Sequence, residues 1–456
     1  MTRVSEALNL SSLIGASAAP GRTISTRASI LRLDDFSATT RLSDDPRTLA
    51  GRSVILLTDD ALAAAGALIE LDGLARRIVL CPPDFDVSHL GSIVRDAEAQ
   101  AIVHSGAAPT LAMPAVDLVH CGLPARRIAC PVTRANTTQW VLMTSGTTGV
   151  PKMVVHTLAT LTSAIKPAAL QNWATFYDIR RYGGLQIFLR AVAGRGSLTL
   201  PGAEETIEDF LIRCGEAGVT HISGTPSHWR RVLMSQAARR MEPQYVRLSG
   251  EIADGAVLSA LAALYPRAKI AHAYASTEAG VGFSVDDGLP GFPASYVEQV
   301  ETGVAMRVVD GVLRLSSRGA ALSYLGGNAA ALSDEDGFVD TGDLVELRDG
   351  RYHFVGRSNG VINIGGAKVH PEEVEAVVNM QPGVRLCLVK ARKNPITGAL
   401  VAADIVLDAG VAASDGLRAT IIDACRQKLA PHKVPALVRF VPMLAMTSGG
   451  KLARHG

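Results

Sequence analysis

The sequence predicts an α/β protein with a large N-terminal domain, residues 1–357, and a small α+β C-terminal domain, residues 358–456. Between residues 52 and 277, short apolar runs alternate with longer periodic runs, which indicates parallel or mixed sheets with flanking helices. After residue 300, Asp-Gly pairs separate alternating segments, which predicts hairpins and a small β-barrel-like part. The final segment returns to strand and helix patterns of its own.

Strands and helices alternate from residue 52, whereas residues 1–50 are rich in Ser, Thr, Ala and Arg and show little periodicity. Apolar runs predict strands at 52–58, 76–82, 100–105 and 138–144. Periodic runs predict helices at 59–75 and 86–99. Such alternation implies a largely parallel sheet with helices on its faces.

The same pattern continues after the strand at 138–144. Further strands are predicted at 196–202, 219–226, 245–251 and 268–277, and helices at 206–218, 227–240 and 254–266. Several of these strands end in a turn of small residues. Because ligands of open α/β sheets gather at the carboxyl ends of strands, these turns are the first candidates for a site.

The chain changes character after residue 300. Hairpins are predicted at 305–317 and 344–357, with Asp-Gly turns at 310–311 and 349–350. The C-terminal domain should contain helices at 370–381 and 414–429 and strands at 384–392 and 400–407. The polar, Gly-flanked segment 356–360 is a reasonable hinge between the two domains.

Composition excludes several classes of protein. The net charge is +2, from 45 basic and 43 acidic residues, so nothing calls for nucleic acid or an anionic membrane as a partner. Apolar runs are shorter than the roughly 18 residues of a membrane span, and the N-terminal apolar patch makes a poor signal peptide. The six cysteines show no C-x-x-C spacing, which favours reduced, mostly buried thiols in a cytoplasmic protein.

The stretch VLMTSGTTGVPKMVVHT, residues 141–157, has the composition of an anion-binding loop. Successive backbone N–H groups in a Gly/Ser/Thr turn form a concave donor surface, hydroxyl groups add donors, and Lys152 adds charge. The stretch does not match the G-x-x-x-x-G-K-[ST] pattern of the common phosphate-binding loop. Taken alone, it is equally compatible with an ordinary surface loop.

A second turn, YASTEAG at 274–280, follows a predicted strand. The ring of Tyr274 can stack on a nucleotide base, and Glu278 can hold Mg²⁺, which carboxylates and substrate phosphates usually bind together. The alternative is a helix N-terminus that begins at Ser276 or Thr277, with Glu278 in its first turn.

Two more short motifs lie toward the C-terminus. In DTGDL, residues 340–344, a carboxylate after a tight turn can accept both hydroxyl groups of a ribose, and a GR pair follows at 356–357. The alternative is an Asp-rich turn. In TSGGKLARHG, Lys451 follows a Gly-rich turn, and the alternative is a solvated tail.

Five motifs in this order resemble the acyl-adenylate-forming superfamily, which includes acyl-CoA and aryl-CoA ligases, adenylation domains of nonribosomal peptide synthetases and firefly luciferase. The motifs are LMTSGTTGVPK, YASTE, DTGDL, GRSNGVINIGGAKVHPEEVE and TSGGK, and the resemblance covers residues from about 50 to 456. It implies that the protein joins a carboxylate to AMP with loss of pyrophosphate and then passes the acyl group to a thiol.

The resemblance also implies a role for each motif. The β- and γ-phosphates of ATP would be wrapped by Thr144, Ser145, Gly146, Thr147, Thr148, Gly149 and Lys152. The base would lie against Tyr274, Gly250, Glu251 and Ile252, and the ribose on Asp343 with help from Arg357. The reacting groups would be held by Thr277 at the α-phosphate, by Glu278 through Mg²⁺, and by Lys451 between the carboxylate and the α-phosphate.

The C-terminal domain resembles the mobile domain of the family, which changes its pose after adenylation. Asn359 falls at the hinge position, where the family usually shows Asp or Lys. The pair Gly365 and Gly366 would let pantetheine pass close to the backbone, as in acyl- and aryl-CoA ligases. Met153 occupies a position where the family usually has Gly.

The acid pocket departs from the family most clearly in the segment FYDIRRYGGLQIFLRAVAGRG. Arg181 falls at or near a slot where acyl-CoA ligases tend to carry His and amino-acid adenylators Asp. We hypothesise that Arg180 or Arg181 favours an acid with a second polar or anionic group, and the alternative is an arginine paired on the surface with Asp178. Other pocket candidates are Gly183, Gly184, Ser223, Gly224, Thr225, His272 and Ala273.

The leading functional hypothesis is therefore a ligase that uses ATP and Mg²⁺ to form an acyl-AMP and then a thioester with coenzyme A. A second hypothesis is a stand-alone adenylating enzyme that loads the phosphopantetheine of a carrier protein acting in trans. A third is a non-catalytic nucleotide-binding homologue, against which Glu278, Asp343 and Lys451 speak. The expected partners are a small carboxylic acid and the thiol carrier, and the sequence is compatible with an oligomer.

Overall fold

A seven-stranded sheet begins at residue 53. The computed structural model describes residues 8–17, 19–110, 116–122, 124–128, 132–144, 151–166, 170–298, 303–326, 331–358, 360–364, 367–394 and 398–445. The strand order is β20 (Ser323–Leu325), β10 (Lys152–Thr157), β9 (Gln139–Thr144), β5 (Arg77–Leu80), β4 (Ser53–Leu57), β6 (Ala101–His104) and β7 (Asp117–His120). The strands from β9 to β7 are parallel, as predicted, and β10 and β20 run antiparallel.

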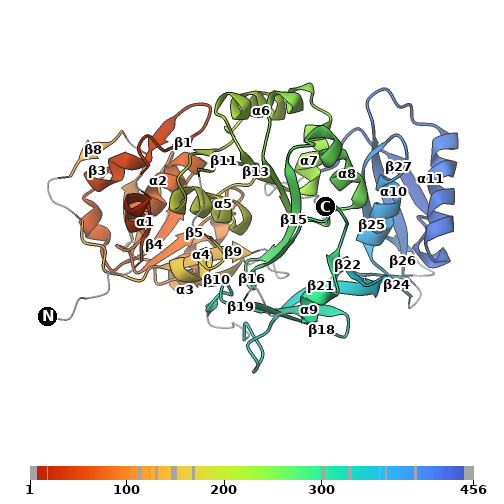
Figure 1. The fold of residues 1–456 in the computed structure, drawn as a ribbon. Coiled ribbons are helices and arrows are strands. Elements are labelled where there is room, and N and C mark those ends of the chain that lie inside the picture. Colours follow the sequence, from red (N-terminus) through yellow and green to blue (C-terminus); the bar gives the residue numbers. More distant parts are fainter. Residues whose placement is uncertain are drawn as a thin grey trace.

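An eight-stranded sheet packs beside the first (Figure 1). Its order is β16 (Gly280–Val285), β15 (Lys269–Ser276), β14 (Tyr245–Ser249), β13 (His221–Gly224), β11 (Trp173–Thr175), β12 (Leu198–Thr199), β1 (Thr23–Ser25) and β2 (Ile30–Arg32). The strands from β15 to β1 are parallel. Strand β1 pairs Ile24 with Leu198, so the segment without periodicity supplies one edge of this sheet.

Helices separate and cover the two sheets. One apolar cluster joins both sheets to α1 (Leu10–Ala16), α2 (Ala61–Leu71) and α5 (Tyr182–Ala193). A second cluster packs α6 (Ile207–Glu216), α7 (Pro226–Leu233) and α8 (Gly255–Leu264) on the other face of the eight-stranded sheet. A third packs α3 (Leu90–Asp96) on the outer face of the seven-stranded sheet. Because each parallel strand needs a crossover connection, helices lie on both faces.

The two predicted hairpins form a five-stranded sheet with the order β17 (Phe292–Pro293), β22 (Arg351–Arg357), β21 (Val339–Arg348), β19 (Val312–Ser317) and β18 (Val304–Val309). Both turns take positive φ at two consecutive residues. Asp310 and Gly311 have φ of 52° and 77°, and Asp349 and Gly350 have φ of 48° and 74°. This is the turn that two-residue hairpins favour, and it confirms both Asp-Gly predictions.

The C-terminal unit has a core of its own, which extends from Ile362 to Val438. It contains β23 (Ile362–Ile364), β24 (Ala367–Val369), α10 (Pro371–Asn379), β25 (Val384–Asn394), β26 (Gly398–Leu407), α11 (Asp415–Lys428) and β27 (Leu437–Phe440). Figure 1 shows these elements in blue beside α7 and α8. Glu373 on α10 lies 3.8 Å from Arg348 of the five-stranded sheet and 2.7 Å from Lys433.

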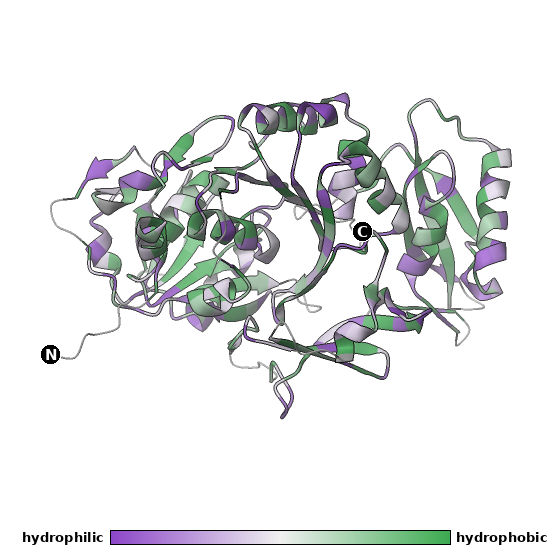
Figure 2. Ribbon diagram, in the orientation of Figure 1, coloured by the Kyte–Doolittle hydropathy of each residue, from purple (hydrophilic) through white to green (hydrophobic). Residues whose placement is uncertain are grey.

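Short elements complete the fold. They are β3 (Thr39–Thr40), β8 (Arg126–Arg127), α4 (Leu158–Thr162), α9 (Ser295–Glu298) and the 3₁₀ turns Leu33–Ser37, Pro46–Leu49, Val87–His89, Gln236–Arg240 and Pro431–Lys433. Figure 2 shows hydrophobic strands inside the large sheets and hydrophilic residues along α11. Within the described ranges, no helix is long and apolar enough to cross a membrane. The five described cysteines are buried free thiols, as predicted, and Cys130 lies outside the described residues.

Candidate active site

The turn after β15 is held through its backbone. His156 on β10 is fully buried, and its Nε2 lies 2.7 Å from the carbonyl oxygen of Thr277, to which it donates. The backbone N–H of Ala321 donates to the carbonyl of Glu278 at 2.9 Å. Burial lowers the pKa of His156 to about 4, so its imidazole is neutral near pH 7. These contacts leave the side chains of Thr277 and Glu278 available for a ligand.

Lys152 lies close to this turn. It begins β10 and pairs in register with Thr144, the last residue of β9. Its Nζ lies 5.5 Å from the ring centroid of Tyr324 on β20. The backbone N–H of Leu322 donates to the carbonyl of Val155 on β10 at 2.8 Å, one residue after the Ala321 N–H that binds the Glu278 carbonyl, so the segment that leads into β20 joins β10 to the turn. Burial raises the pKa of Tyr324, and the charge of Glu278 raises it further. A lysine and a carboxylate from separate motifs therefore approach the same place.

Glu278 is a suitable carboxylate for Mg²⁺ held jointly with nucleotide phosphates. Among the described residues, no three His, Cys, Asp or Glu side chains gather into a group that could hold a metal by themselves. A Mg²⁺ ion here would need oxygen ligands from the substrate, which is the usual arrangement for this ion.

Asp343 and Arg357 form the predicted pair of the DTGDL and GR motifs. They are partners in register on β21 and β22, and Arg357 Nε lies 2.9 Å from Asp343 Oδ1. The hydroxyl of Tyr274 donates to the other carboxylate oxygen. Burial alone would lower the pKa of Arg357, but the charge of the Asp343 carboxylate and its hydrogen bond together raise that pKa above its usual value. Burial and the same carboxylate raise the pKa of Tyr274 well above its usual value.

Aromatic neighbours fix the ring of Tyr274. Phe283, its cross-strand partner on β16, lies with its centroid 5.5 Å away at an interplanar angle of 16°. Phe354 on β22 lies 5.2 Å away at 8°. Near-parallel rings at these separations are offset stacks. The orientation of the Tyr274 ring is thus set by β15, β16 and β22. The contact of this ring with adenine stays a prediction.

Gly250, Glu251 and Ile252 follow β14, the parallel neighbour of β15. Gly250 has φ of +83°, a conformation that glycine adopts without strain. One carboxylate oxygen of Glu251 accepts a hydrogen bond of 2.9 Å from the backbone N–H of Ser227, in the first turn of α7. Glu251 therefore stabilises the start of a helix beside the predicted base site.

The predicted pocket residues at the end of β13 have different environments. Gly224 approaches Phe176 so closely that a Cβ atom would lie 2.8 Å from its ring. Thr225 is fully buried and caps the N-terminus of α7, where its hydroxyl accepts from the N–H of His228 at 3.1 Å. Ser223 is 1% exposed, and its hydroxyl has no hydrogen-bond partner among the described residues. Of these three residues, only Ser223 has a polar group left for a ligand.

The first turn of α5 holds the next candidates. Gly184 packs against backbone, because a Cβ atom there would lie 2.1 Å from the carbonyl oxygen of Asp178, whereas at Gly183 the nearest atom would be 3.6 Å away, in the ring of Tyr177. Arg181 pairs with Asp84. Arg180 pairs with Asp178 at 2.6 Å, which is the pairing that the alternative interpretation expected. The Arg180 side chain is only 4% exposed, so the pair lies inside the protein and not on the surface.

His272 and Ala273 are consecutive on β15 and so point to opposite faces of the sheet. Ala273 is in register with Ser249 and is buried. His272 Nε2 lies 3.0 Å from the carbonyl oxygen of Leu289, toward the five-stranded sheet. Burial lowers its pKa. The structure does not bring these two side chains together.

Several predicted residues lie outside the described residues. They are Ser145, Gly146, Thr147, Thr148 and Gly149 of the phosphate loop, the hinge residue Asn359, Gly365, Gly366 and Lys451. The roles predicted for these residues stay predictions. Met153, the unexplained departure, is 3% exposed and is paired in register with Met143 and Leu325, so it is a core residue of β10.

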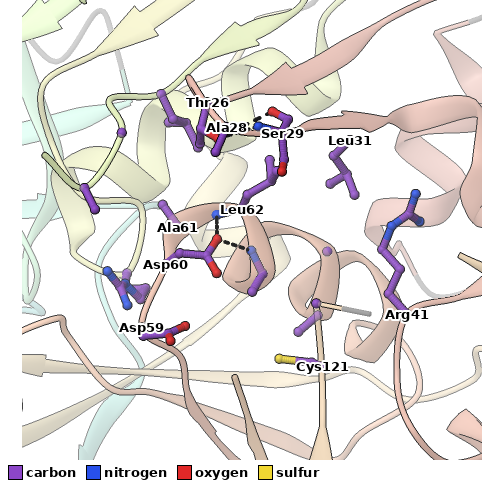
Figure 3. Close-up of a pocket in the computed structure, with 18 of the residues that line it drawn as sticks. Thr26, Ala28, Ser29, Leu31, Arg41, Asp59, Asp60, Ala61, Leu62 and Cys121 are labelled. Atoms are coloured by element: carbon purple, nitrogen blue, oxygen red, sulfur yellow. Dashed lines mark hydrogen bonds between the residues drawn. The ribbon is translucent and has the colours of Figure 1, made fainter. Parts of the chain in front are cut away.

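A cavity of about 980 Å³ lies next to the predicted pocket (Figure 3). It opens between the β1–β2 hairpin, the start of α2 and the segment after β7. Asp60 accepts hydrogen bonds of 2.8 Å from the N–H groups of Leu62 and Ala63 and so caps α2. Phe176 and Tyr177 border the cavity, and of the predicted pocket residues Arg180 is the one that lines it. The carboxyl-end rule applied to β4 would have pointed to this place.

Two functional candidates carried no sequence motif. Tyr177 donates its hydroxyl to the carbonyl oxygen of Ser249 at 2.7 Å and bridges the ends of β11 and β14. His156, which positions the turn at Thr277, is an ordinary strand residue in the sequence. In both cases the partner is more than seventy residues away in the chain, so only the packed structure reveals the contact.

Comparisons with known proteins agree with this architecture. The sequence model of the AMP-binding enzyme family matches residues 76–320, and that of the AMP-binding enzyme C-terminal domain matches residues 373–451. The long-chain-fatty-acid–CoA ligase FadD13 of Mycobacterium tuberculosis is 27% identical over 351 residues, which are 69% of this chain and 66% of that protein. The chain thus spans slightly less than two thirds of this relative's length.

Solved structures share the fold. The anthranilate CoA ligase AuaEII in complex with anthranoyl-AMP aligns with a TM-score of 0.80 at 19% identity and covers 98% of this chain and 95% of that one. A benzoate CoA ligase from Burkholderia xenovorans aligns with a TM-score of 0.77 at 18% identity and covers 98% of both chains. Because the family model covers more than half of the sequence and the whole fold is shared, the chain belongs to the AMP-binding enzyme family.

Proposed function

We propose that the protein activates a carboxylic acid as an acyl-AMP and then transfers the acyl group to the thiol of coenzyme A. The observation that carries the proposal is the convergence of Lys152 and Glu278 beside the linked set of Tyr274, Asp343 and Arg357. The first two suit the phosphates of ATP with Mg²⁺, and the others suit its base and ribose. FadD13, a relative, is a CoA ligase by name.

The first step forms a bond between a carboxylate oxygen and the α-phosphorus of ATP. The bond from that phosphorus to the bridging oxygen breaks, and pyrophosphate leaves. Negative charge gathers on the phosphoryl oxygens, so preorganised cations stabilise the transition state. Lys152 would act on the departing phosphates and Lys451 on the α-phosphate, while a Mg²⁺ ion on Glu278 would supply further positive charge.

The second step is attack of a thiol sulfur on the acyl carbonyl carbon, with AMP as the leaving group and a thioester as the product. The C-terminal unit, with its separate core and its contact through Glu373 and Arg348, would change its pose between the steps. The paired glycines Gly365 and Gly366 would admit the pantetheine arm. Buried free thiols at the described cysteines fit a cytoplasmic enzyme.

Acid-dependent exchange of labelled pyrophosphate into ATP tests the first step. We expect exchange with a suitable acid, and roughly a hundredfold loss in Glu278→Gln. Glu335→Gln, a charge change in the segment before β21, is the matched control. Absence of exchange across a broad acid library, with folded protein and Mg²⁺ present, would refute the proposal.

A second assay identifies the acceptor. Preformed acyl-AMP is incubated with either coenzyme A or a phosphopantetheinylated carrier protein, and thioester formation is measured. We expect coenzyme A to be acylated. Faster acylation of the carrier would instead identify a stand-alone loading enzyme.

A further inference from the structure

Two arginines between helix α5 and the inner face of the eight-stranded sheet have no acidic partner among the described residues. Arg247 lies in the middle of β14, and Arg190 lies in the last turn of α5. Among the described residues, neither guanidinium takes part in an ion pair or hydrogen bond, and the Nε of Arg190 is buried. Both side chains are only partly exposed. A partly buried cation without a partner is costly, so this arrangement needs an explanation.

The strands fix where Arg247 points. Tyr245, Arg247 and Ser249 alternate with Val246 and Leu248, which belong to the core on the opposite face. Tyr245 contacts Trp173, a member of the cluster that contains α5. Arg247 is therefore on the α5 side of the sheet. Arg247 is partly exposed, although β14 lies between β13 and β15 in the sheet. The Arg247 side chain therefore reaches a space that solvent can enter.

Helix α5 presents its own polar groups to the same region. Tyr182, Gln186 and Arg190 recur every four residues and so share one face of the helix. Tyr245, on the same face of β14 as Arg247, packs against the cluster that contains α5, so this helix covers the face from which Arg247 projects. The charges of Arg190 and Arg247 both lower the pKa of the Tyr182 phenol, against the larger effect of burial. Burial, and after it the charge of Arg247, lowers the pKa of Arg190 to about 10. The two guanidiniums repel each other and would be stabilised by an anion.

Ser223 completes the group. It is in register with Arg247 on the neighbouring strand and faces the same side, because His221, two residues earlier, also contacts Trp173. Its hydroxyl is buried and lacks a partner within the described part of the chain. Side chains opposite each other on paired strands lie roughly 5 Å apart. The side chains of Arg190, Arg247 and Ser223 are therefore donors for which the described residues supply no acceptor, and we call them the donor cluster.

Ser223 is one of the predicted acid-pocket residues, so the donor cluster lies where we expect the inner end of that pocket. Arg247 is two residues before Ser249, where β14 ends beside Ala273, so it lies roughly 7 Å deeper than the strand ends. An acid whose reacting carboxylate is near Thr277 would reach the donor cluster with its far end. Arg180 and Arg181, the sequence candidates for this task, are already paired with Asp178 and Asp84.

We infer that the acid is a dicarboxylic acid whose second carboxylate binds to Arg247, Arg190 and Ser223. The inference rests on the proposed function, because it names the substrate class of the same pocket. Guanidinium groups bind carboxylates through paired, charge-assisted hydrogen bonds, and a buried serine hydroxyl adds a third donor. A short aliphatic chain or a benzene ring would span the depth between the two carboxylates.

The test compares dicarboxylic acids with their monomethyl esters in pyrophosphate exchange. The acids run from succinate to suberate and include isophthalate and terephthalate. The wild type should use its best diacid at least about 30-fold better, by kcat/KM, than the matching ester. Arg247→Gln and Arg190→Gln should each lose most of that preference, and Arg247→Lys should keep part of it. Arg267→Gln, which removes an exposed charge paired with Glu242, is the control.

A thermal unfolding assay without ATP separates this inference from the proposed function. The preferred dicarboxylate alone should raise the Tm of the wild type and of Arg267→Gln, but not that of Arg247→Gln. Equal use of diacids and esters by the wild type, or a preference that survives both glutamine variants, would overturn the inference. An increase in the KM for coenzyme A alone in the Arg247→Gln and Arg190→Gln variants would also overturn the inference. The donor cluster would then bind an anionic group of coenzyme A. If no acid supports pyrophosphate exchange, but a dicarboxylate still raises the Tm in a way that depends on Arg247, only the proposed function is refuted.

Discussion

Arg357 Nε lies 2.9 Å from Asp343 Oδ1 across the β21–β22 hairpin, and the Tyr274 hydroxyl donates to the opposite oxygen of the same carboxylate. The carboxylate is therefore held from two sides, by Arg357 on β22 and by Tyr274 on β15, a strand that is far from the hairpin in the chain. A ribose bound here would meet an acceptor whose position is already fixed. Preorganisation of this kind lowers the ordering cost of binding.

Asp343→Asn should raise the KM for ATP by roughly tenfold to a hundredfold, because a charged hydrogen bond contributes about 1.5–3 kcal/mol. The exchange assay at varied ATP concentration measures this change. Tyr274→Phe removes only the hydroxyl and should have a smaller effect. Asp336→Asn, an exposed carboxylate paired with Arg307, is the control. An unchanged KM in Asp343→Asn would remove Asp343 from the nucleotide site.

Two adjacent glycines on α5 should respond in opposite ways to alanine. Gly184→Ala would place its Cβ 2.1 Å from the Asp178 carbonyl oxygen, so we expect a loss of about 1–3 kcal/mol in the free energy of unfolding. Gly183→Ala meets only ordinary contact with Tyr177 and should be neutral or stabilising by up to about 1 kcal/mol. Urea unfolding of both variants measures the difference. Equal stability would show that the start of α5 adjusts freely.

Buried neutral histidines predict a loss of stability in mild acid. His156 and His228 are buried, and burial lowers the pKa of each from 6.5 to about 4. Between these values the unfolded chain binds protons that the folded chain does not, so the free energy of unfolding falls as pH decreases from 6.5 to 4. The expected loss at pH 5 is about 1–2 kcal/mol per histidine.

Chemical denaturation between pH 7 and 4 measures this loss. In His156→Gln, the loss in free energy of unfolding between pH 7 and 4 should be smaller by the contribution of one histidine. In His432→Gln, at an exposed position, the loss should equal that of the wild type. The opposite slope, with stability rising in acid, would contradict neutral burial.

Lys451→Ala should abolish most adenylation, by roughly 10²–10³ in rate, if this lysine stabilises charge at the α-phosphate. Thioester formation from a supplied acyl-AMP should persist. Comparison of the two partial reactions in one preparation is the measurement, and Lys428→Ala on α11 is a control on the same unit. Normal adenylation by Lys451→Ala would remove this residue from the chemistry.

Most of the fold could be predicted from local patterns. Periodicity located most of the longer strands and helices from residue 53 onward, and Asp-Gly pairs located both hairpins because only a few residues accept positive φ twice in succession. The missed elements include β1, β11 and α5. Strands β1 and β11 have only three residues each, which is too short for a period to emerge. Gly183 and Gly184 lie in the first turn of α5 and weaken its helical pattern.

The candidate site was less predictable than the fold. Motifs located Lys152, Glu278, Asp343 and Arg357, since each belongs to a short contiguous pattern. Arg190 and Arg247 escaped notice because nothing in the sequence distinguishes an arginine with a carboxylate partner from one without. Conversely, Arg181 drew attention by its position, although Asp84, which is far away in the chain, neutralises its charge. Long-range pairing decided each of these cases.

The parallel pairing of β1 with β12 has a consequence for how the chain folds. Ile24 pairs with Leu198, and the guanidinium of Arg22 donates to the carbonyl oxygens of Val192 and Gly194 at the end of α5, at 3.1 and 2.7 Å. On the ribosome, β1 must therefore wait until β12 has emerged. Pairing of such distant segments is slow and leaves apolar surface open to aggregation. The strand that is synthesised first thus joins β12 among the last, and slower synthesis at low temperature should increase the yield of folded protein.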